Sequence, residues 1–516
     1  MEADMVFIST ASDIHCYNIR RVSAYLKKFG YKVKIIFLPQ PFANRYGAKV
    51  LEQMVDLCKG SKLVGISFMS NYWYNSKQII KALRESSPET LVIGGGPHPT
   101  TNPEQCLEEM DFICIGEGDD TLLELLTRVV KGIKDYSGII NLVYKQNGKI
   151  FRNQSGKFEK IELIGTPDYD LEDHYILFKG KIIPMTYRLF RCFYGEVYAT
   201  QMAFGCPFTC SFCIHNIINK QFKYQHRMRP IKNVLSELQE IYKKFPFFRE
   251  LRIDDDTFFF YSKEELEEFR DGYVKVMGLP IYVTGGQPMV IREEKLKPMV
   301  EAGMYRLRMG IQSGSSKIQK LYQRNYPNWR ILEACKIINK FKDRVRASYD
   351  IITDNPWETD EDKLATLILA MDIPHPYSLS VFSLAFFPNT DIHKQALEDG
   401  KISKDYDVLS KHYSGMENNY LNLMYSVVEK PYIPRKFKEF LLKKSVRESV
   451  FAPLIKHGLK FFRLLLNRMG LTVQLFSYIK RLDLVRVKFS IEKFVYDYKY
   501  YYSSRGQILG GKPYSQ

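Results

Sequence analysis

Three cysteines stand close together in the stretch AFGCPFTCSFCIHN, residues 203–216. Cys206, Cys210 and Cys213 follow the spacing C-x-x-x-C-x-x-C. Thiolates are soft ligands that select iron–sulfur clusters, zinc or copper(I), and they are the usual ligands of iron–sulfur clusters. A four-iron cluster has one iron at each corner, and this loop supplies three ligands. The spacing therefore predicts a cluster whose fourth iron is open to a ligand from outside the protein.

A structural zinc site is the alternative for the same loop. Its ligands would be the three cysteines and His215, because zinc accepts sulfur and imidazole ligands in a tetrahedral arrangement. Zinc ribbons, however, pair two separated C-x-x-C knuckles, and the sequence has no second knuckle. The sequence therefore favours the cluster over the zinc ion.

The loop resembles the cluster motif of the radical S-adenosylmethionine (radical SAM) enzymes. An aromatic residue usually precedes the last cysteine in that family, and Phe212 stands at that position. The resemblance implies that the open iron binds the amino and carboxylate groups of S-adenosylmethionine. It also implies that an electron from the cluster cleaves the sulfonium and releases a 5′-deoxyadenosyl radical.

The composition is that of a large folded protein with reduced thiols. The chain has 516 residues, of which 45% are hydrophobic, and this length suggests about two to four domains. Its nine cysteines are scattered apart from the loop, as in proteins of a reducing compartment. The first residues lack a basic region typical of a signal peptide, and no stretch of about 18 apolar residues predicts a transmembrane helix. We therefore expect a cytoplasmic location, with membrane association left open by the charge pattern.

Positive charge is concentrated near the C-terminus. The net charge is +17, and the segment from Arg435 to Lys512 holds 18 Lys and Arg against 5 Asp and Glu. Such a segment can contact nucleic acid, an anionic membrane or an acidic substrate, or it can be the solvated surface of helices. The charge alone does not choose among these.

The first 140 residues alternate short apolar runs with helical patterns. Strands are expected at 5–9, 31–39, 63–68, 90–95 and 112–116, and helices at 19–30, 48–58, 75–86, 103–109 and 119–131. Successive strand–helix–strand units imply a parallel sheet with helices on both faces. We therefore predict a Rossmann-like domain over residues 1–140, with its ligand at the carboxyl ends of the strands.

That edge resembles the cobalamin-binding domain that precedes many radical SAM enzymes. Asp13 and His15 match the family's D-x-H, although Asn18 replaces its glycine, and Ser67 begins the segment that corresponds to S-x-L. The run Gly94, Gly95 and Gly96 lets the backbone approach a flat cofactor closely. The resemblance implies cobalamin as a cofactor, with His15 as a candidate cobalt ligand. The alternative is a Rossmann-like domain without a cofactor.

The next segments predict a linker and a barrel. Residues 141–186 are expected to connect the domains, with a β-hairpin at NLVYKQNGKIF. Six strand–helix repeats over residues 187–400 fit the partial (β/α)6 barrel of the radical SAM fold, whose site lies at the carboxyl ends of the strands. The predicted fold class is thus α/β, with a Rossmann-like domain, a partial barrel and a mainly helical C-terminal domain at 401–516.

Further motifs in the barrel match the radical SAM family by position. The resemblance assigns S-adenosylmethionine contacts to Asp255 and Asp256 in DDTF, and to Gln312 and Ser313 in GIQSGS. The text YDIITDNPWET matches a later strand, but Asp354 and Asn355 replace the usual Gly-Leu, which puts any contact there in doubt. Taken singly, DDTF also suits a helix N-cap and GIQSGS an ordinary turn.

The last 115 residues match no family. FAPLIKHGLKFFRLLLNRMG, residues 451–470, is basic and apolar at helical spacing, which suits either a membrane surface or packing on the barrel. FVYDYKYYY, residues 494–502, interleaves aromatic and basic residues as single-stranded nucleic-acid sites do. The sequence holds no recognisable RNA-binding module, so nucleic acid is not an expected partner.

These features together predict a cobalamin-dependent radical SAM methylase. By resemblance, methylcobalamin formed from one S-adenosylmethionine delivers its methyl group to an unactivated carbon, from which the deoxyadenosyl radical has removed hydrogen. The alternatives are a radical SAM cyclase or oxidase and a non-catalytic iron–sulfur sensor. The substrate remains open among a lipid, a peptide or protein, a tetrapyrrole and a small metabolite. An external one-electron donor is expected, and no catalytic side chain is assigned.

Overall fold

The computed structural model describes residues 2–39, 45–156, 161–222, 226–403 and 416–480. The chain divides into two compact units, Met1–Glu448 and Ser449–Gln516. The first unit contains both expected α/β domains and also the helices that follow them. The compact units therefore part at residue 449, whereas the sequence suggested a C-terminal domain beginning at residue 401.

A nine-stranded sheet forms the N-terminal part of the first unit, in the order β7-β6-β5-β4-β3-β1-β2-β8-β9. Its parallel centre consists of β1 (Met5–Ser9), β2 (Val33–Phe37), β3 (Leu63–Ser67), β4 (Leu91–Gly95) and β5 (Phe112–Cys114). All five residues of β1 are buried, as expected for a strand with helices on both faces.

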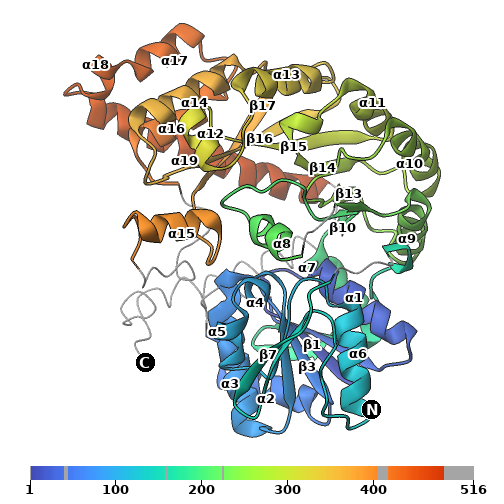
Figure 1. Ribbon diagram of the computed structural model, residues 1–516. Coiled ribbons are helices and arrows are strands. Elements are labelled where there is room, and N and C mark those ends of the chain that lie inside the picture. Colours follow the sequence, from blue (N-terminus) through green and yellow to red (C-terminus); the bar gives the residue numbers. More distant parts are fainter. Residues whose placement is uncertain (1, 40–44, 157–160, 223–225, 404–415, 481–516) are drawn as a thin grey trace. The chain divides into compact units, whose positions relative to one another are not determined.

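Helices cover both faces of this sheet. One face carries α1 (Tyr17–Lys28) and α6 (Asp119–Val130), and the other carries α2 (Ala48–Cys58), α3 (Trp73–Ser86) and α5 (Pro103–Leu107) (Figure 1). Two separate apolar clusters, one on each side, hold the layers together. The structure confirms the predicted Rossmann-like domain.

The segment expected as a linker instead extends this sheet at both edges. Its strands are β6 (Leu142–Gln146), β7 (Lys149–Arg152), β8 (His174–Phe178) and β9 (Lys181–Pro184). The predicted hairpin is β6–β7, and its turn is made by Asn147 and Gly148, both with positive φ, at 51° and 74°. An Asn-Gly pair is the usual choice for such a turn. The sequence pattern showed the hairpin but not the sheet edge that it would join.

A second sheet of six parallel strands follows the chain in order. Its strands are β10 (Val197–Thr200), β13 (Glu250–Ile253), β14 (Ile281–Gly286), β15 (Met304–Gln312), β16 (Arg346–Thr353) and β17 (Tyr377–Ser383). Helices α9 (Ile231–Lys244), α10 (Lys263–Val276), α11 (Glu293–Glu301), α13 (Asn328–Asn339) and α14 (Asp360–Asp372) lie along its outer side (Figure 1). This arrangement confirms the predicted partial barrel.

Two stretches of the barrel sequence each form two elements. The helical sequence pattern over 316–341 forms two helices, α12 (Ser316–Leu321) and α13, because Pro327 immediately precedes α13 and Gln323 has a positive φ of 54°. Proline disfavours helical backbone in the residue before it. The apolar stretch 197–205 likewise forms two short strands: β10 stops at Thr200, and β11 (Ala203–Phe204) pairs with β12 (Arg227–Met228).

A buried ion pair lies where the two sheets' domains meet. Arg229 Nη2 is 2.8 Å from Glu237 Oε2, and both side chains are 0% exposed. Glu237 also accepts hydrogen bonds from the hydroxyls of Tyr198 (2.9 Å) and Tyr17 (3.3 Å), and Tyr17 is the first residue of α1. Arg229 donates a further bond to the Tyr17 hydroxyl at 3.0 Å. One carboxylate thus joins the N-terminal domain to the barrel.

Helices α15 (Asp391–Glu398), α16 (Tyr420–Val428), α17 (Arg435–Leu442) and α18 (Lys444–Arg447) complete the described part of the first unit. The second unit holds α19 (Ala452–Lys480), which contains the helix expected at 451–470. The aromatic segment 494–502 lies outside the described residues. None of the helices within the described ranges is long and apolar enough to cross a membrane.

Glu237→Ala is expected to destabilise the first unit by about 3–5 kcal/mol, because it leaves the Arg229 guanidinium buried without a counter-charge. Chemical unfolding followed by circular dichroism measures this loss. Glu85→Ala is the matched control: its carboxylate is 65% exposed and 3.8 Å from Lys81, so its removal should cost at most about 1 kcal/mol. Equal effects of the two substitutions would show that the buried pair does not support the fold.

Candidate functional site

Tertiary contacts hold the three-cysteine loop between β11 and α8 (Ile214–Phe222). The chain turns at Gly205, whose φ is +82°. Thr257 donates a hydrogen bond to Cys206 Sγ at 3.0 Å, and Arg324 Nη1 approaches Cys210 Sγ at 3.5 Å. Asn219 in α8 binds the carbonyl of Cys206 at 2.9 Å. Residues from distant parts of the barrel therefore orient the thiols.

The donor set fits a cluster better than a single ion. Burial raises the pKa of Cys206 to about 11 and that of Cys213 to about 12, and the neighbouring thiols act in the same direction. Iron would displace these protons and stabilise the thiolates. A cluster binds each thiolate at a different iron, so the sulfur atoms need not converge on one point.

The structure does not support the zinc alternative. Across the described ranges, no three His, Cys, Asp or Glu side chains are gathered so that they could hold one metal ion. His215, the fourth ligand of that alternative, instead pairs through Nε2 with Asp256 at 3.0 Å.

The two carboxylates of DDTF have different positions. Asp255 is 4% exposed and accepts a 2.8 Å hydrogen bond from the backbone N–H of Met202, just ahead of the loop. Burial raises the pKa of the Asp255 carboxyl well above its usual range. Asp256 is 42% exposed and reaches His215. Asp255 therefore supports the strand ahead of the loop, whereas Asp256 is the more accessible of the two carboxylates. Their contacts with S-adenosylmethionine stay predictions.

The GIQSGS residues also divide. Gln312 ends β15 with a positive φ of 71°, and its buried Oε1 has no hydrogen-bond partner. A positive φ at a residue other than glycine costs on the order of 1–3 kcal/mol. The Gln312 Oε1 atom is unpaired among the described residues, so it can accept a hydrogen bond from a ligand. Ser313 is fully buried and bonded to Thr366 at 3.1 Å. Its hydroxyl is therefore engaged within the barrel, and its contact with S-adenosylmethionine stays a prediction.

Phe212 packs edge-on against Tyr322, with ring centroids 5.1 Å apart. Tyr322 is fully buried in a cluster with Leu384 and Phe386. The aromatic residue before the last cysteine therefore anchors the loop to the barrel, and its contact with the cofactor stays a prediction.

A cavity of about 240 Å³ lies between the carboxyl edge of the first sheet and the cysteine loop. From the sheet it is lined by the four residues that the sequence singled out there: Ser67, Gly94, Gly95 and Gly96. From the barrel side it is lined by Gln201, Phe204, Gly205, Ile214, His215, Ile218 and Asp256. The predicted cobalamin edge and the predicted cluster loop thus face one cavity.

Gly94, Gly95 and Gly96 line one side of this cavity and are called the glycine cradle below. A Cβ at Gly95 would meet no atom within 4 Å, so this backbone is open to the cavity. Gly96 has a φ of +90°, and a Cβ there would stand 2.8 Å from Ser67 Oγ. Because the backbone at Gly95 carries no side chain, a large flat ligand can approach it closely. The residues present therefore fit a corrinoid.

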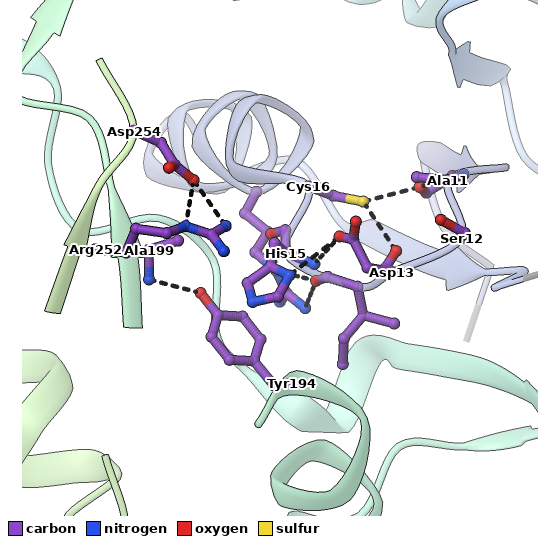
Figure 2. A network of polar contacts seen from close by, with 12 residues as sticks. Ala11, Ser12, Asp13, His15, Cys16, Tyr194, Ala199, Arg252 and Asp254 are labelled. Atoms are coloured by element: carbon purple, nitrogen blue, oxygen red, sulfur yellow. Dashed lines mark hydrogen bonds and ion pairs between the residues drawn. The ribbon is translucent and has the colours of Figure 1, made fainter. Parts of the chain in front are cut away.

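Asp13 and His15, in contrast, do not line this cavity. Asp13 Oδ1 lies 3.1 Å from His15 Nδ1, and the imidazole packs against the Tyr194 ring at a tilt of 54°, with ring centroids 4.4 Å apart (Figure 2). The buried Arg20 guanidinium binds the carbonyls of Ile14 at 3.0 Å and His15 at 3.1 Å. The D-x-H pair exists as predicted, but it faces Tyr194 and not the glycine cradle.

Several lining residues were missed by the sequence reading. Asn18 and Arg21 of α1 and Glu117 line the cavity together with Gln201 and His215. Arg21 carries no sequence signal of its own, because buried residues occupy nearly every position of α1 from Ile19 to Leu26 and helical periodicity does not single it out. Gln201 and His215 give no signal either, since only the folded chain brings them to the cavity.

Two family models match the chain. The B12-binding domain covers residues 3–126, and the radical SAM superfamily covers residues 200–370. An uncharacterized methyltransferase, PH0819 of Pyrococcus horikoshii, is 29% identical over 345 residues, which span 65% of this chain and 69% of that protein. The anaerobic magnesium-protoporphyrin IX monomethyl ester cyclase of Rubrivivax gelatinosus is 26% identical over 309 residues, 57% of this chain and 51% of the cyclase.

Solved structures share the fold. TsrM of Kitasatospora setae, a radical SAM methyltransferase solved with cobalamin and a [4Fe-4S] cluster, superimposes with a TM-score of 0.62 at 17% identity, covering 77% of this chain and 78% of TsrM. OxsB, solved with aqua-cobalamin and S-adenosylmethionine, gives a TM-score of 0.64 at 13% identity, covering 99% and 82%. At such identities the likeness concerns the fold alone.

His15→Ala is expected to leave the coordination of bound cobalt unchanged, because His15 is held by Asp13 and Tyr194 outside the cavity. Electron paramagnetic resonance of the cobalt(II) form reports a nitrogen ligand directly through its hyperfine splitting. Loss of a nitrogen splitting in the variant, with cobalt still bound, would instead make His15 a cobalt ligand.

The B12-binding and radical SAM domains imply cobalamin, S-adenosylmethionine and a [4Fe-4S] cluster as cofactors. Cys206, Cys210 and Cys213 would hold the cluster, and the glycine cradle would receive the corrinoid. The chain therefore carries a B12-binding domain and a radical SAM domain, and the predicted cofactor edges of both line one cavity.

Proposed function

We propose that the chain transfers a methyl group from S-adenosylmethionine, with cobalamin as the carrier, to an unactivated carbon of an organic substrate. The observation that carries this proposal is the single cavity bounded by both the glycine cradle and the cluster loop. When bound, the cofactors supply the methyl group and the radical that polar side chains cannot supply. The residues of the chain hold these groups in one place, which removes the entropy cost of bringing them together. The methyltransferase relative PH0819 supports the same proposal.

The inner side of the barrel is where we expect the substrate to be oriented. Charged side chains lie at every second position of some of these strands. Arg308 binds Asp350 through both carboxylate oxygens, at 2.7 and 2.8 Å. Arg252 binds Asp254 at 2.7 Å. The Arg306 guanidinium lies over the Tyr282 ring at 4.6 Å. Such paired charges suit hydrogen bonding to polar groups of a substrate, and they leave the choice among the substrate classes open.

Two other functions are alternatives to the methylase. The relationship to the magnesium-protoporphyrin cyclase favours a radical SAM cyclase or oxidase as the second candidate, in which no methyl group reaches a substrate. A cluster-bearing sensor without turnover is the third. The chain covers only about half of the cyclase's length, so the methylase remains the first candidate.

Methyl-labelled S-adenosylmethionine distinguishes these candidates on protein loaded anaerobically with iron, sulfide and cobalamin, with titanium(III) citrate as the electron donor. We expect 5′-deoxyadenosine to form and label to move onto the bound cobalamin. Cys206→Ala should lose the cluster, measured as bound iron, and all cleavage, whereas Cys192→Ala, outside the loop, should retain both. Deoxyadenosine without label on cobalamin would favour the cyclase or oxidase, and neither product would favour a sensor.

We also propose that the C-terminal helix contacts an anionic membrane surface. Nine of the 21 exposed large apolar side chains in the described residues lie between Tyr432 and Leu465. In α19, Leu454, Phe461 and Leu465 are 72%, 69% and 47% exposed and share one helical face, whereas Leu459 on the opposite face is buried. Residues 449–480 contain five Lys and Arg and no Asp or Glu. An exposed apolar face beside basic residues is typical of helices that lie in a lipid interface.

Sedimentation with vesicles tests this contact. The chain should bind vesicles of phosphatidylcholine with phosphatidylserine more tightly than vesicles of phosphatidylcholine alone. Leu454→Ser with Phe461→Ser should weaken binding at least ~10-fold, because each inserted side chain contributes about 1.5–3 kcal/mol. Val274→Ser with Ile368→Ser removes two similarly exposed side chains elsewhere (55% and 48%) and should change nothing. Absence of binding to the anionic vesicles would exclude the membrane contact.

A further inference from the structure

The guanidinium of Arg21 is buried with two donors unused. Arg21 is 6% exposed, and its Nη2 donates to Asp119 Oδ2 at 2.7 Å. Among the described residues, its Nε and Nη1 have no hydrogen-bond partner. Leaving charged donors unpaired in a protein interior is costly, so they are expected to meet an acceptor that the described part of the chain does not provide.

The position of Arg21 indicates where that acceptor comes from. Arg21 lines the cavity of about 240 Å³ together with the glycine cradle, Asn18 and Val22. Its guanidinium also lies 5.0 Å from the ring centre of Phe204. Phe204 is the last residue of β11 and stands two residues before Cys206. The side chain therefore stands at the wall between the corrinoid cavity and the strand that leads into the cluster loop.

Part of the cavity lining is apolar. Phe7, Gly65, Ile93, Cys114 and Leu122, from the strands and from α6, line the same space as Arg21. The carboxylates of Asp119 and Glu117 are already paired: Asp119 binds Arg21 itself, and Glu117 binds Arg227. Each of these carboxylates is neutralised by its own arginine. The two unused donors of Arg21 are therefore suited to an oxygen acceptor on a bound ligand.

We propose that Arg21 donates hydrogen bonds to an oxygen acceptor of the bound corrinoid and so selects and orients this cofactor. The acceptor belongs either to the nucleotide tail, whose aromatic base suits the apolar part of the lining, or to an amide side chain of the corrin ring. The proposal rests on the proposed function only in requiring that the chain binds cobalamin. No motif in the sequence marks this residue.

A smaller cavity of about 130 Å³ also touches Arg21, together with Tyr25, Lys28 and Thr166. As an alternative, the unused donors of Arg21 would bind water in this smaller cavity. The affinity for the corrinoid would then not depend on Arg21. A measurement of corrinoid binding therefore distinguishes the two alternatives without an assay of turnover.

The experiment is a titration of the anaerobic full-length chain with hydroxocobalamin and with cobinamide, which lacks the nucleotide tail. Arg21→Lys keeps a cation for Asp119 but loses the fork of donors. Arg21→Met with Asp119→Asn removes the whole pair and leaves no buried charge unpaired. The matched control, Arg84→Met with Asp111→Asn, removes a 2.8 Å pair of the same domain that lines neither cavity. Circular dichroism and thermal unfolding without corrinoid establish that each variant is folded.

Both Arg21 variants should raise the Kd for cobalamin by ~10- to 100-fold, the range that hydrogen bonds to charged groups contribute, and the control should stay within about twofold. An equal loss for cobinamide would assign the acceptor to the corrin ring, and an unchanged cobinamide affinity would assign it to the tail. Folded Arg21 variants that bind cobalamin like the wild type would overturn the proposal. A wild-type chain that binds no cobalamin would overturn the proposed function and this inference together.

Discussion

The buried Arg229–Glu237 ion pair is the contact on which the arrangement of the two α/β domains depends. Its two side chains are completely shielded from water, and the Tyr17 hydroxyl of the N-terminal domain binds both of them. Buried charges of this kind contribute little net stability compared with apolar packing, but breaking them is costly. The pair therefore acts as a geometric constraint, because only one placement of α1 against the barrel satisfies all its hydrogen bonds.

This constraint has a chemical consequence. Parallel sheets bind their ligands at the carboxyl ends of the strands, and here both sheets present that end to one cavity. The glycine cradle of the first sheet and the His215–Asp256 pair beside the cluster loop lie on its walls. Chemistry that passes between two cofactors requires such proximity. The fold supplies it without any residue that looks catalytic by itself.

The loop that carries the cysteines is supported from outside. Its thiols receive contacts from Thr257 and Arg324, and the strand ahead of it is tied down by the Asp255 carboxylate. These supports come from distant parts of the chain, because Asp255 and Thr257 follow β13 whereas Arg324 lies between α12 and α13. Asp255 and Ser313, which resemble ligand contacts by motif, also take part in this framework through their hydrogen bonds to Met202 and Thr366.

The sequence by itself determined the α/β architecture, and it predicted the cluster cysteines and the glycine edge. Each of these depends on local spacing: alternating strand and helix periods, C-x-x-x-C-x-x-C, and three consecutive glycines after a strand. It did not reveal that residues 141–186 extend the first sheet, because edge pairing is decided by which strand remains unpaired. Nor did it show that His15 faces Tyr194 while Arg21 lines the cavity with unused donors. Those roles depend on which side chains meet across the domain boundary, and only the tertiary structure decides that.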